Sequence, residues 1–283
     1  MPELPEVETI RKNLIPKICR KVIADVVVLE PKQFIGNKNL IIQGLVEDIT
    51  RRGKILTIKI KKPGKNFLYL NIHLKMSGQL LYAENKDNAV YKNIIPKTNS
   101  FKLPTTTTRV IIIFSDNSAL FFNDLRKFGW IKISRETMIT KGTDVLSPEF
   151  TLEKLGNLIK SVNKPIKVFL MDQSMIAGIG NIYANDALFI AGIDPQRKTQ
   201  SLSHVEIKRL FKSINKVIKE GLKLRGSSAK DESYILPDGS RGSYQKHFRV
   251  YERENQPCLV CQKKIKRIKQ GGRSTYFCPN CQK

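Results

Sequence analysis

The chain begins MPELPEVET, so removal of Met1 leaves Pro2 as the first residue, with a secondary amine. An α-amino group titrates near pH ~8, far below a lysine, so part of it is neutral at cellular pH. Such an amine attacks a sugar carbon to form an iminium, which acidifies the neighbouring C–H bond and permits elimination. Glu3 is placed to move protons, and Glu6 to orient the amine and complement a helix dipole. The opening therefore predicts covalent catalysis.

The same stretch has a simpler interpretation, because Pro and Glu are favoured at the start of a helix. Apolar residues recur at helical spacing just after it: Val7, Ile10, Leu14 and Ile18. This spacing predicts an amphipathic helix that anchors the N-terminus. In isolation, the opening residues favour this structural interpretation.

Four of the five cysteines have the spacing C-x2-C-x16-C-x2-C: Cys258, Cys261, Cys278 and Cys281. Two close pairs at this separation are typical of a four-thiolate zinc site rather than a disulfide framework. We expect one structural Zn²⁺ per chain. Four thiolates leave no position for an activated water, so the metal supports the fold and not the chemistry.

The segment between the cysteine pairs predicts a β-hairpin. Gly271 and Gly272 supply positive φ at its two-residue turn, which places Arg273 at the tip. From residue 257 onward the chain has seven Lys or Arg and no Asp or Glu, which favours DNA or RNA as the partner. The alternative is a purely structural module, since a small domain without a core uses zinc to fold.

The whole chain is basic: 50 Lys and Arg against 25 Asp and Glu in 283 residues leave a formal net charge of +25. Such an excess is typical of a protein that binds a polyanion, and nucleic acid is the first candidate. No apolar run approaches the ~20 residues of a membrane-spanning helix, and no signal peptide precedes the first charges. We therefore expect a cytoplasmic protein that does not enter membranes.

Short runs of alternating apolar and polar residues extend from about residue 22 to 131, as in KILTIKIKK and FLYLNIHLK. The run RVIIIF-SDNS-ALFF predicts a hairpin, and such strands indicate a β-sandwich or barrel. The segment AENKDNAVYKNIIPKTNSFKLPTTTT has weak periodicity and many turn formers, so we interpret it as a long loop. From SPEFTLEKL through IKEGLK the period is helical.

These patterns predict an α+β fold with several domains and a boundary near residues 135–150. We expect an N-terminal β-sandwich with a leading helix over 1–135 and a helical domain over 145–225. A Gly- and Ser-rich loop and connection follows over 226–248, and the zinc finger occupies 249–283.

The segment AGIGNIYANDAL places Gly178 and Gly180 before a helix, with Asn181 expected as its N-cap. Helix N-termini of this kind also bind phosphates. A G-x-G pattern alone is weak, and a tight turn between helices is the simpler interpretation. It is not a dinucleotide-binding motif, because a third glycine is missing and we expect no strand before it.

In combination, these features resemble formamidopyrimidine-DNA glycosylases nearly from end to end. The segments that carry the resemblance are MPELPEVETI at 1–10, RRGKIL at 51–56, HLKMSGQL at 73–80, DLRKFGW at 124–130, AGIGNIYANDALF at 177–189 and the cysteine module. The resemblance implies a bacterial base-excision-repair enzyme with a β-sandwich, a helix–two-turn–helix domain and a zinc finger. It implies a monomer that removes oxidised purines, such as 8-oxoguanine opposite cytosine, from double-stranded DNA and cleaves abasic sites by β,δ-elimination.

Position by position, the resemblance makes Pro2 the nucleophile, Glu3 the general acid and base, and Glu6 a supporting active-site carboxylate. Lys54 corresponds to a lysine that contacts the phosphate beside the lesion, although a solvated lysine at the start of a strand is the alternative. Arg273 corresponds to the finger arginine that grips the phosphodiester. We count Lys54 and Arg273 with the catalytic residues.

Met76, Arg126 and Phe128 correspond to three residues that fill the gap left by an extruded nucleotide. A thioether and a ring restore stacking, and a guanidinium donates to the orphaned base. The alternative is that Met76 and Phe128 are core residues. Asn181 corresponds to the phosphate-binding asparagine of the two-turn loop, and His73 is counted with the DNA-binding residues.

Two positions depart from the family pattern. Lys75 stands where many relatives carry glycine, and DESYILPDGSRG, after Ser227 and Ser228, is about two residues longer than the corresponding loop. That loop covers the damaged base in the family. The preferred lesion and the opposite base therefore stay open.

Three other functions compete with this interpretation. The pyrimidine-directed endonuclease VIII shares a Pro-Glu start, but PELPEV rather than PEGPE argues against it. A catalytically silent damage-binding protein and a zinc-ribbon RNA-binding or ribosome-associated factor would use the same charge. Pro2, Glu3 and Lys54 together argue against both, because binding alone needs no N-terminal secondary amine.

Overall fold

The computed structural model describes most of the chain: residues 1–64, 66–95, 98–138, 140–228 and 234–283. The chain forms two compact units. Unit 1 comprises Met1–Ile139 and Leu224–Ser243, and unit 2 comprises Thr140–Lys223 and Tyr244–Lys283. The segment 226–248, which the sequence presents as one connection, thus contributes to both units.

Unit 1 is a β-sandwich, as expected. Its first sheet has the order β1 (Ile23–Val28), β9 (Thr108–Phe114), β10 (Ala119–Asp124) and β6 (Gly78–Ala83). Its second sheet has the order β2 (Phe34–Ile35), β11 (Trp130–Ser134), β5 (Phe67–His73), β4 (Ile55–Lys61) and β3 (Leu45–Arg52). The pair β11 and β2 is parallel, and the other pairs in these two sheets are antiparallel. One hydrophobic core unites side chains of both sheets.

The alternation read from the sequence sets the inward face of these strands. In β4, Leu56, Ile58 and Ile60 are buried in the core, whereas Lys59 and Lys61 are not. The predicted hairpin of β9 and β10 is confirmed by antiparallel pairing from Ala119 opposite Ile113.

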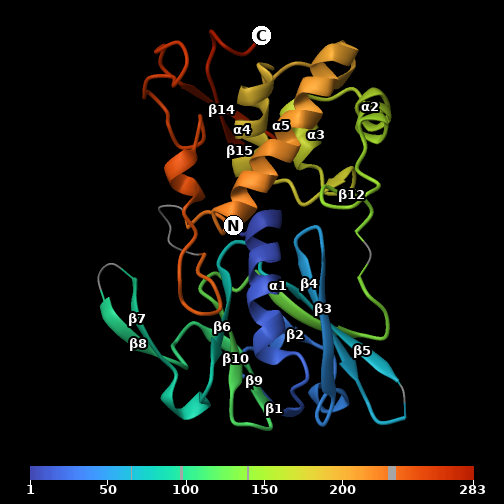
Figure 1. Cartoon of the computed structure of the whole chain (residues 1–283), viewed down its shortest axis with the longest axis vertical. Helices are drawn as coiled ribbons and strands as arrows, with labels where there is room; N and C mark the ends of the chain where they lie inside the picture. The colour runs from blue at the N-terminus through green and yellow to red at the C-terminus, as the bar shows by residue number, and fades with distance from the viewer. Residues whose placement is uncertain (65, 96–97, 139, 229–233) are drawn as a thin grey trace. The chain divides into compact units, whose positions relative to one another are not determined.

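Helix α1 (Leu4–Ile18) confirms the amphipathic helix expected at the N-terminus. Its apolar stripe is buried: Val7, Ile10, Leu14 and Ile18. The helix packs against β3, β4 and β6, which places the N-terminal residues on the sandwich rather than in solvent (Figure 1).

The segment expected to be a long loop instead contains a 3₁₀ turn, η3 (Lys86–Asn88), and a hairpin of β7 (Val90–Ile95) and β8 (Thr98–Lys102). Tyr91 pairs with Phe101 across the hairpin, and their rings stack at 5.6 Å. The loop prediction was wrong because a two-stranded ribbon has no neighbouring strands on its outer edges to impose a regular apolar alternation.

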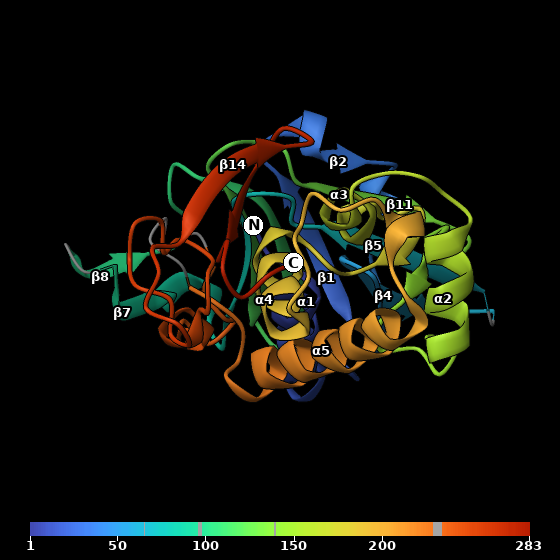
Figure 2. The same cartoon turned by 90° about the horizontal axis from the view of Figure 1, so that it is seen from above.

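Unit 2 is mainly helical and carries the zinc finger. Its elements are β12 (Thr143–Asp144), α2 (Leu152–Lys160), α3 (Ile166–Met171), β13 (Ile176–Ala177), α4 (Asn181–Ala191), α5 (His204–Lys223), β14 (Lys266–Gln270) and β15 (Arg273–Phe277). Helix α5 packs against α4 and α2 (Figure 2). Short 3₁₀ turns complete the two units: η1 (Pro31–Gln33), η2 (Lys38–Leu40), η4 (Thr199–Ser201) and η5 (Tyr244–His247).

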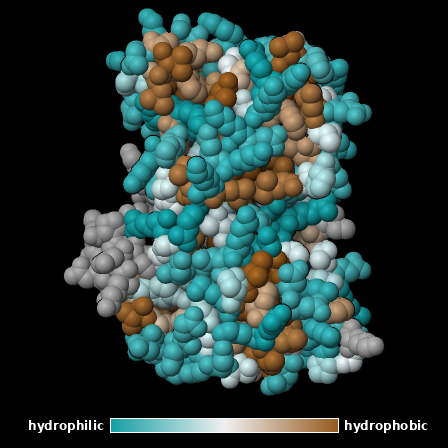
Figure 3. All heavy atoms as spheres, viewed as in Figure 1, coloured by the Kyte–Doolittle hydropathy of each residue, from teal (hydrophilic) through white to brown (hydrophobic). Residues whose placement is uncertain are grey.

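Hydrophilic residues cover most of the face seen in Figure 3, with hydrophobic residues gathered in small patches. Among the described residues, no helix combines the length and the apolar character needed to cross a membrane.

Candidate active site and nucleic-acid interface

The N-terminus is held at the start of α1 by two glutamates. Glu3 is the N-cap, and Glu6 completes a capping box with it. The backbone N–H of Glu3 donates to Oε2 of Glu6 at 2.8 Å. Pro2 is buried, and both glutamates are 1 % exposed. Pro2 and Glu3 thus lie just before the first helical residue and Glu6 lies in the first turn, and all three are buried.

The second oxygen of Glu6 holds a segment far along the chain. The backbone N–H of Ser227 donates to Oε1 of Glu6 at 2.8 Å. A Cβ on Gly226, where φ is +80°, would lie 2.8 Å from that oxygen, so this close approach requires glycine. The Ser227 hydroxyl is buried and has no hydrogen-bond partner among the described residues. The Gly- and Ser-rich loop continues through residues 229–233, which lie outside the described part of the chain.

Lys54 lies in the two-residue turn between β3 and β4, where Gly53 has φ 56°. Lys54 is only 7 % exposed, which excludes the solvated lysine considered from the sequence. Arg51 braces the turn: its Nη1 donates to the carbonyl of Gly53 at 2.8 Å, and its Nε donates to Glu8 of α1 at 3.1 Å. Burial alone would raise the pKa of Glu8, but Arg11 and Arg51 hold that pKa below its usual range. A buried charge network thus connects α1 to the turn that carries Lys54.

Met76, Arg126 and Phe128 come together on two neighbouring loops. Nη1 of Arg126 lies 3.9 Å from the sulfur of Met76, and its guanidinium carbon lies 5.1 Å from the centre of the Phe128 ring. Phe128 is 54 % exposed and Met76 is partly buried, so Phe128 is not a core residue. The trio therefore presents a thioether, a guanidinium and a ring as one group.

A buried carboxylate that the sequence analysis overlooked holds both of these loops. Oδ1 of Asp124 accepts from the Ser77 hydroxyl at 2.5 Å, next to Met76. The same carboxylate accepts from the backbone N–H of Arg126 at 3.2 Å and of Gly129 at 2.7 Å. Asp124 is 0 % exposed. Its position at the start of DLRKFGW, as the last residue of a buried strand, was the available signal.

Two lysines of these loops adopt the left-handed backbone region. Lys75 has φ 51° and Lys127 has φ 56°. This region favours glycine and costs a residue with a Cβ on the order of 1 kcal/mol. The strain lies immediately beside Met76 and Arg126, where Asp124 fixes the surrounding backbone. Glycine would adopt this region at the position of Lys75 without that cost.

His73 ends β5 opposite Ile55, the residue after Lys54. Its Nδ1 accepts from the backbone N–H of Lys75 at 2.9 Å, and its ring centre lies 5.7 Å from that of Trp130. Burial, with the charges of Lys75 and Lys54, lowers the pKa of His73 to about 3. The imidazole is therefore neutral near pH 7, and its Nε2–H is the group left to donate.

The glycine loop of unit 2 leads into α4, but Asn181 does not cap that helix. The N-cap is Gly180, which is extended, and Asn181 is the first helical residue. The capping prediction was wrong because the helical backbone begins one residue earlier than expected, so that Asn181 already lies within it. Oδ1 of Asn181 lies 3.3 Å from Nδ2 of Asn185, one turn further on. The two-residue strand β13 also precedes the loop, where no strand was expected.

Asn185 links the start of α4 to the zinc finger. Its Nδ2 donates to the carbonyl of Asn181 at 2.6 Å, and its Oδ1 accepts from the backbone N–H of Tyr276 at 2.8 Å. Tyr276 lies on β15, the strand that begins with the exposed Arg273. Asn181 and Arg273, the two residues expected to bind phosphate, thus lie on two elements that the Asn185 side chain links.

The next residue along α4, Asp186, fixes the chain that enters the finger. Its fully buried carboxylate accepts from the backbone N–H groups of Arg249 and Val250, each at 3.1 Å, and from the Tyr244 hydroxyl at 3.1 Å. Burial raises the pKa of Asp186 to about 6. Asn185 and Asp186 together fasten the finger to α4.

Lys167 is a second residue that the sequence analysis missed. It is 0 % exposed, and its Nζ donates to the carbonyl of Ser274 at 3.3 Å. Lys167 and Arg273 line the same pocket of about 360 Å³. A lysine inside the apolar run IKVFLM was the signal, since a lysine is rarely buried without a purpose.

The finger has the predicted geometry. Gly271 and Gly272 have φ 53° and 74° at the turn between β14 and β15, which confirms the hairpin. The four sulfur atoms of Cys258, Cys261, Cys278 and Cys281 lie within 4.8 Å of one another. Ligands ~2.3 Å from a tetrahedral zinc have similar mutual distances. The cluster therefore fits one structural Zn²⁺.

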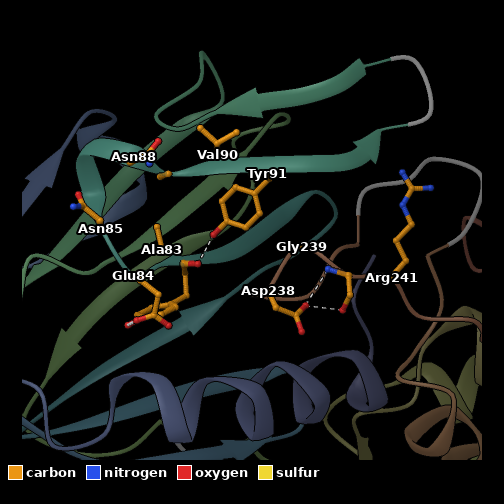
Figure 4. A pocket seen from close by; sticks show the side chains of 12 residues that line it. Ala83, Glu84, Asn85, Asn88, Val90, Tyr91, Asp238, Gly239 and Arg241 are labelled. Atoms are coloured by element: carbon orange, nitrogen blue, oxygen red, sulfur yellow. Dashed lines mark hydrogen bonds between the residues drawn. The ribbon is translucent and has the colours of Figure 1, made fainter.

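A larger pocket of about 860 Å³ lies elsewhere in unit 1, between the β6–β7 region and the turn at residues 238–241 (Figure 4). Asp238 accepts from the Ser240 hydroxyl at 2.6 Å and stabilises this turn. None of the residues expected to act in catalysis lines the pocket. Pocket size alone would therefore misplace the chemistry.

Three family models match successive parts of the chain. The formamidopyrimidine-DNA glycosylase N-terminal domain matches residues 1–131, the glycosylase H2TH domain matches 142–233, and the zinc finger found in FPG and IleRS matches 255–283. The formamidopyrimidine-DNA glycosylase of Carboxydothermus hydrogenoformans is 38 % identical over 292 residues, which cover both chains completely. The chain belongs to the formamidopyrimidine-DNA glycosylase family.

Solved structures of the family agree with this assignment. The MutM (Fpg) protein of Thermus thermophilus is 33 % identical, with a TM-score of 0.86 over 99 % of this chain and 98 % of that one. A Lactococcus lactis Fpg variant in complex with Fapy-dG-containing DNA is 29 % identical, with a TM-score of 0.82 over 99 % of each chain. The expected formamidopyrimidine-DNA glycosylase family and fold class are thereby confirmed.

Proposed function

We propose that this DNA glycosylase removes oxidised purines from duplex DNA through Pro2 and then cleaves the abasic strand by β,δ-elimination. The observation that carries the proposal is the buried start of α1, where Pro2 adjoins Glu3 and Glu6 accepts from the backbone N–H groups of Glu3 and Ser227. A helix start alone needs neither this burial nor the bond to Ser227. A repair glycosylase of bacterial type acts on cytoplasmic DNA, and we propose that location and a monomeric state.

The reaction begins once Met1 has been removed. The nitrogen of Pro2 attacks the sugar carbon that carries the base, and the N-glycosidic bond breaks with its electrons leaving on the base. Glu3 delivers the proton needed at the ring oxygen or the leaving group. The bond between that sugar carbon and the ring oxygen then breaks, which gives the iminium, and the ring oxygen takes a proton. Loss of a proton from the next sugar carbon expels the 3′ phosphate, and a second elimination expels the 5′ phosphate.

Glu6 and Ser227 support the site from two sides. Glu6 holds the N–H of Glu3 and thereby the direction of the N-terminal nitrogen. The buried Ser227 hydroxyl is placed beside it to receive a polar group of the extruded base. A buried hydroxyl gains most from such a bond, because leaving it unsatisfied costs about 1–3 kcal/mol.

Met76, Arg126 and Phe128 fill the space left in the duplex. Phe128 is exposed enough to insert between bases, and Arg126 lies between it and Met76 with donors to spare for an orphaned cytosine. Lys54 contacts the phosphate at the lesion, while Asn181 and Arg273 bind phosphates from unit 2.

The decisive assay compares strand cleavage on matched duplexes. One carries 8-oxoguanine opposite cytosine, one an abasic site, one an oxidised pyrimidine and one no lesion. We expect cleavage of the first two, with phosphate left on both sides of the gap. Base excision without strand cleavage would remove the lyase step from the proposal, and a preference for the oxidised pyrimidine would favour the endonuclease VIII activity.

Binding without cleavage, with Met1 shown to be absent by mass spectrometry, would leave a damage-binding protein. Equal affinity for a lesion-free RNA would point to the RNA-binding alternative.

A further inference from the structure

Helix α5 carries a row of exposed lysines that the site described above does not use. The row, here named the lysine stripe, consists of Lys208, Lys212, Lys216, Lys219 and Lys223. All five residues are exposed, and none has an ion pair or hydrogen bond among the described residues.

The spacing of the stripe places its members on one face. At 3.6 residues per turn, the five lysines fall within an arc of about 80° and extend along roughly 22 Å of the helix. The other residue of α5 within that arc is Val205, which is also exposed. The distance corresponds to roughly six phosphates along one strand of B-DNA.

The acidic residues of α5 do not neutralise the stripe. Glu206 pairs with Arg197, and Glu220 pairs with Arg249 at 2.6 Å. Both glutamates lie outside the lysine arc on the same helical geometry. No acidic residue of α5 therefore neutralises the exposed charge of the stripe.

The stripe lies opposite the face that packs on α4. The buried positions of α5 centre about 180° away from the lysines. They include Gly221, where an added Cβ would lie 2.6 Å from the Tyr183 ring of α4. Figure 2 shows α5 at the outer edge of unit 2 with α4 beside it. The stripe is thus a different surface from the start of α4, where Asn181 lies.

We infer that the lysine stripe binds the phosphate backbone of a second DNA duplex while the first occupies the site. The partner is DNA because the protein belongs to a DNA-glycosylase family and because the row matches the length and sign of a phosphate strand. A second contact lets the protein transfer between duplexes without first dissociating into solvent. The inference requires only DNA binding and does not depend on the chemistry of Pro2.

The test is a chase experiment with the full-length zinc-loaded protein. The protein is bound to a fluorescent lesion-free duplex, and unlabelled duplex is added at increasing concentration. For direct transfer, the dissociation rate of the label rises in proportion to the chase concentration. Replacement of all five stripe lysines by Gln should abolish this dependence on chase concentration. At the lowest chase concentration, the dissociation rate of this variant should stay within about twofold of that of the unaltered protein.

The matched control replaces five exposed lysines elsewhere: Lys12, Lys32, Lys61, Lys132 and Lys154. It removes the same net charge and should keep the chase dependence. A second stripe variant, with Lys212 and Lys219 changed to Glu, should also lose it, which guards against effects specific to Gln. Circular dichroism and single-turnover excision check that each variant is folded.

Three results would overturn the inference. The first is a chase-independent rate in the unaltered protein, and the second is an unchanged dependence in both stripe variants. The third is stripe-dependent binding to phosphatidylglycerol vesicles or to duplex RNA with no effect on DNA transfer, which would assign the surface to another polyanion. If the unaltered protein transfers between duplexes but does not excise the damaged base, the result counts against the proposed function and not against this inference.

Discussion

The carboxylates of the site in unit 1 are buried, whereas the charges expected to bind DNA in unit 2 are mostly exposed. Glu3, Glu6 and Asp124 are at most 1 % exposed and accept hydrogen bonds from backbone N–H groups or a hydroxyl. Arg273 and the lysine stripe face solvent. Chemistry needs groups held in one geometry and shielded from water, while a phosphate grip needs charge and tolerates motion.

The largest expected effect comes from changing a buried carboxylate of unit 1. Glu3→Gln should lower the single-turnover excision rate by at least ~100-fold, because general acid–base catalysis is typically worth that much. Affinity for the same duplex should stay within about twofold. The control is Glu153→Gln, at an exposed position in the first turn of α2. A loss of affinity equal to the loss of rate would show that Glu3 serves binding rather than chemistry.

Loss of a zinc ligand should weaken DNA binding by the exposed charges of unit 2. Cys278→Ser removes one of four thiolates, so we expect the finger to unfold and DNA affinity to fall more than tenfold. Fluorescence anisotropy at fixed salt measures the affinity, and metal analysis measures the zinc. Cys19→Ser, outside the cluster, should retain one zinc and normal binding. Normal affinity in the Cys278 variant would separate the finger from DNA binding.

Asp124→Ala tests whether the buried carboxylate of Asp124 holds the loops that carry Met76 and Arg126. The change leaves the N–H groups of Arg126 and Gly129 without their acceptor, so we expect a loss of about 2 kcal/mol in unfolding free energy. It should also reduce the preference for cytosine over adenine opposite the lesion, because the Arg126 loop loses its support. Asp116→Ala, at a half-exposed ion pair, is the control. Unchanged opposite-base preference would contradict the positioning role.

The smallest expected effect at neutral pH concerns His73. Its pKa is lowered to about 3 in the folded protein, so the unfolded chain binds the proton more readily. Stability should therefore be complete above pH ~6.5, the ordinary value, and decline as the pH falls toward 3. Denaturant unfolding of His73→Gln should show a shallower decline across pH 4–6 than the unaltered protein. If NMR shows that His73 titrates near pH 6.5 in the folded protein, its pKa is not lowered and this explanation of the pH dependence is wrong.

The sequence predicts those features that depend on local spacing. Periodicity located α1 and the strand faces, because burial follows the repeat of each element. The cysteine spacing and the two glycines located the finger and its turn. Short motifs that resemble those of formamidopyrimidine-DNA glycosylases predicted the family, and the matching family models and relatives confirmed it.

Contacts between distant residues could not be read in this way. The bond from Ser227 to Glu6 joins residues 221 positions apart, and Asp124 reaches Ser77 across 47 positions. The same limit concealed Lys167, whose burial beside the finger depends on tertiary packing. The error at Asn181 was local, since a shift of one residue in a helix start changes which side chain is the cap.

The most direct test of the account is borohydride trapping on a duplex with 8-oxoguanine opposite cytosine, followed by peptide mapping of the adduct. We expect a covalent adduct on the nitrogen of Pro2 in protein that has lost Met1. An adduct mapped to Lys54 or Lys167, or no adduct on this duplex or an abasic one with Met1 absent, would contradict it.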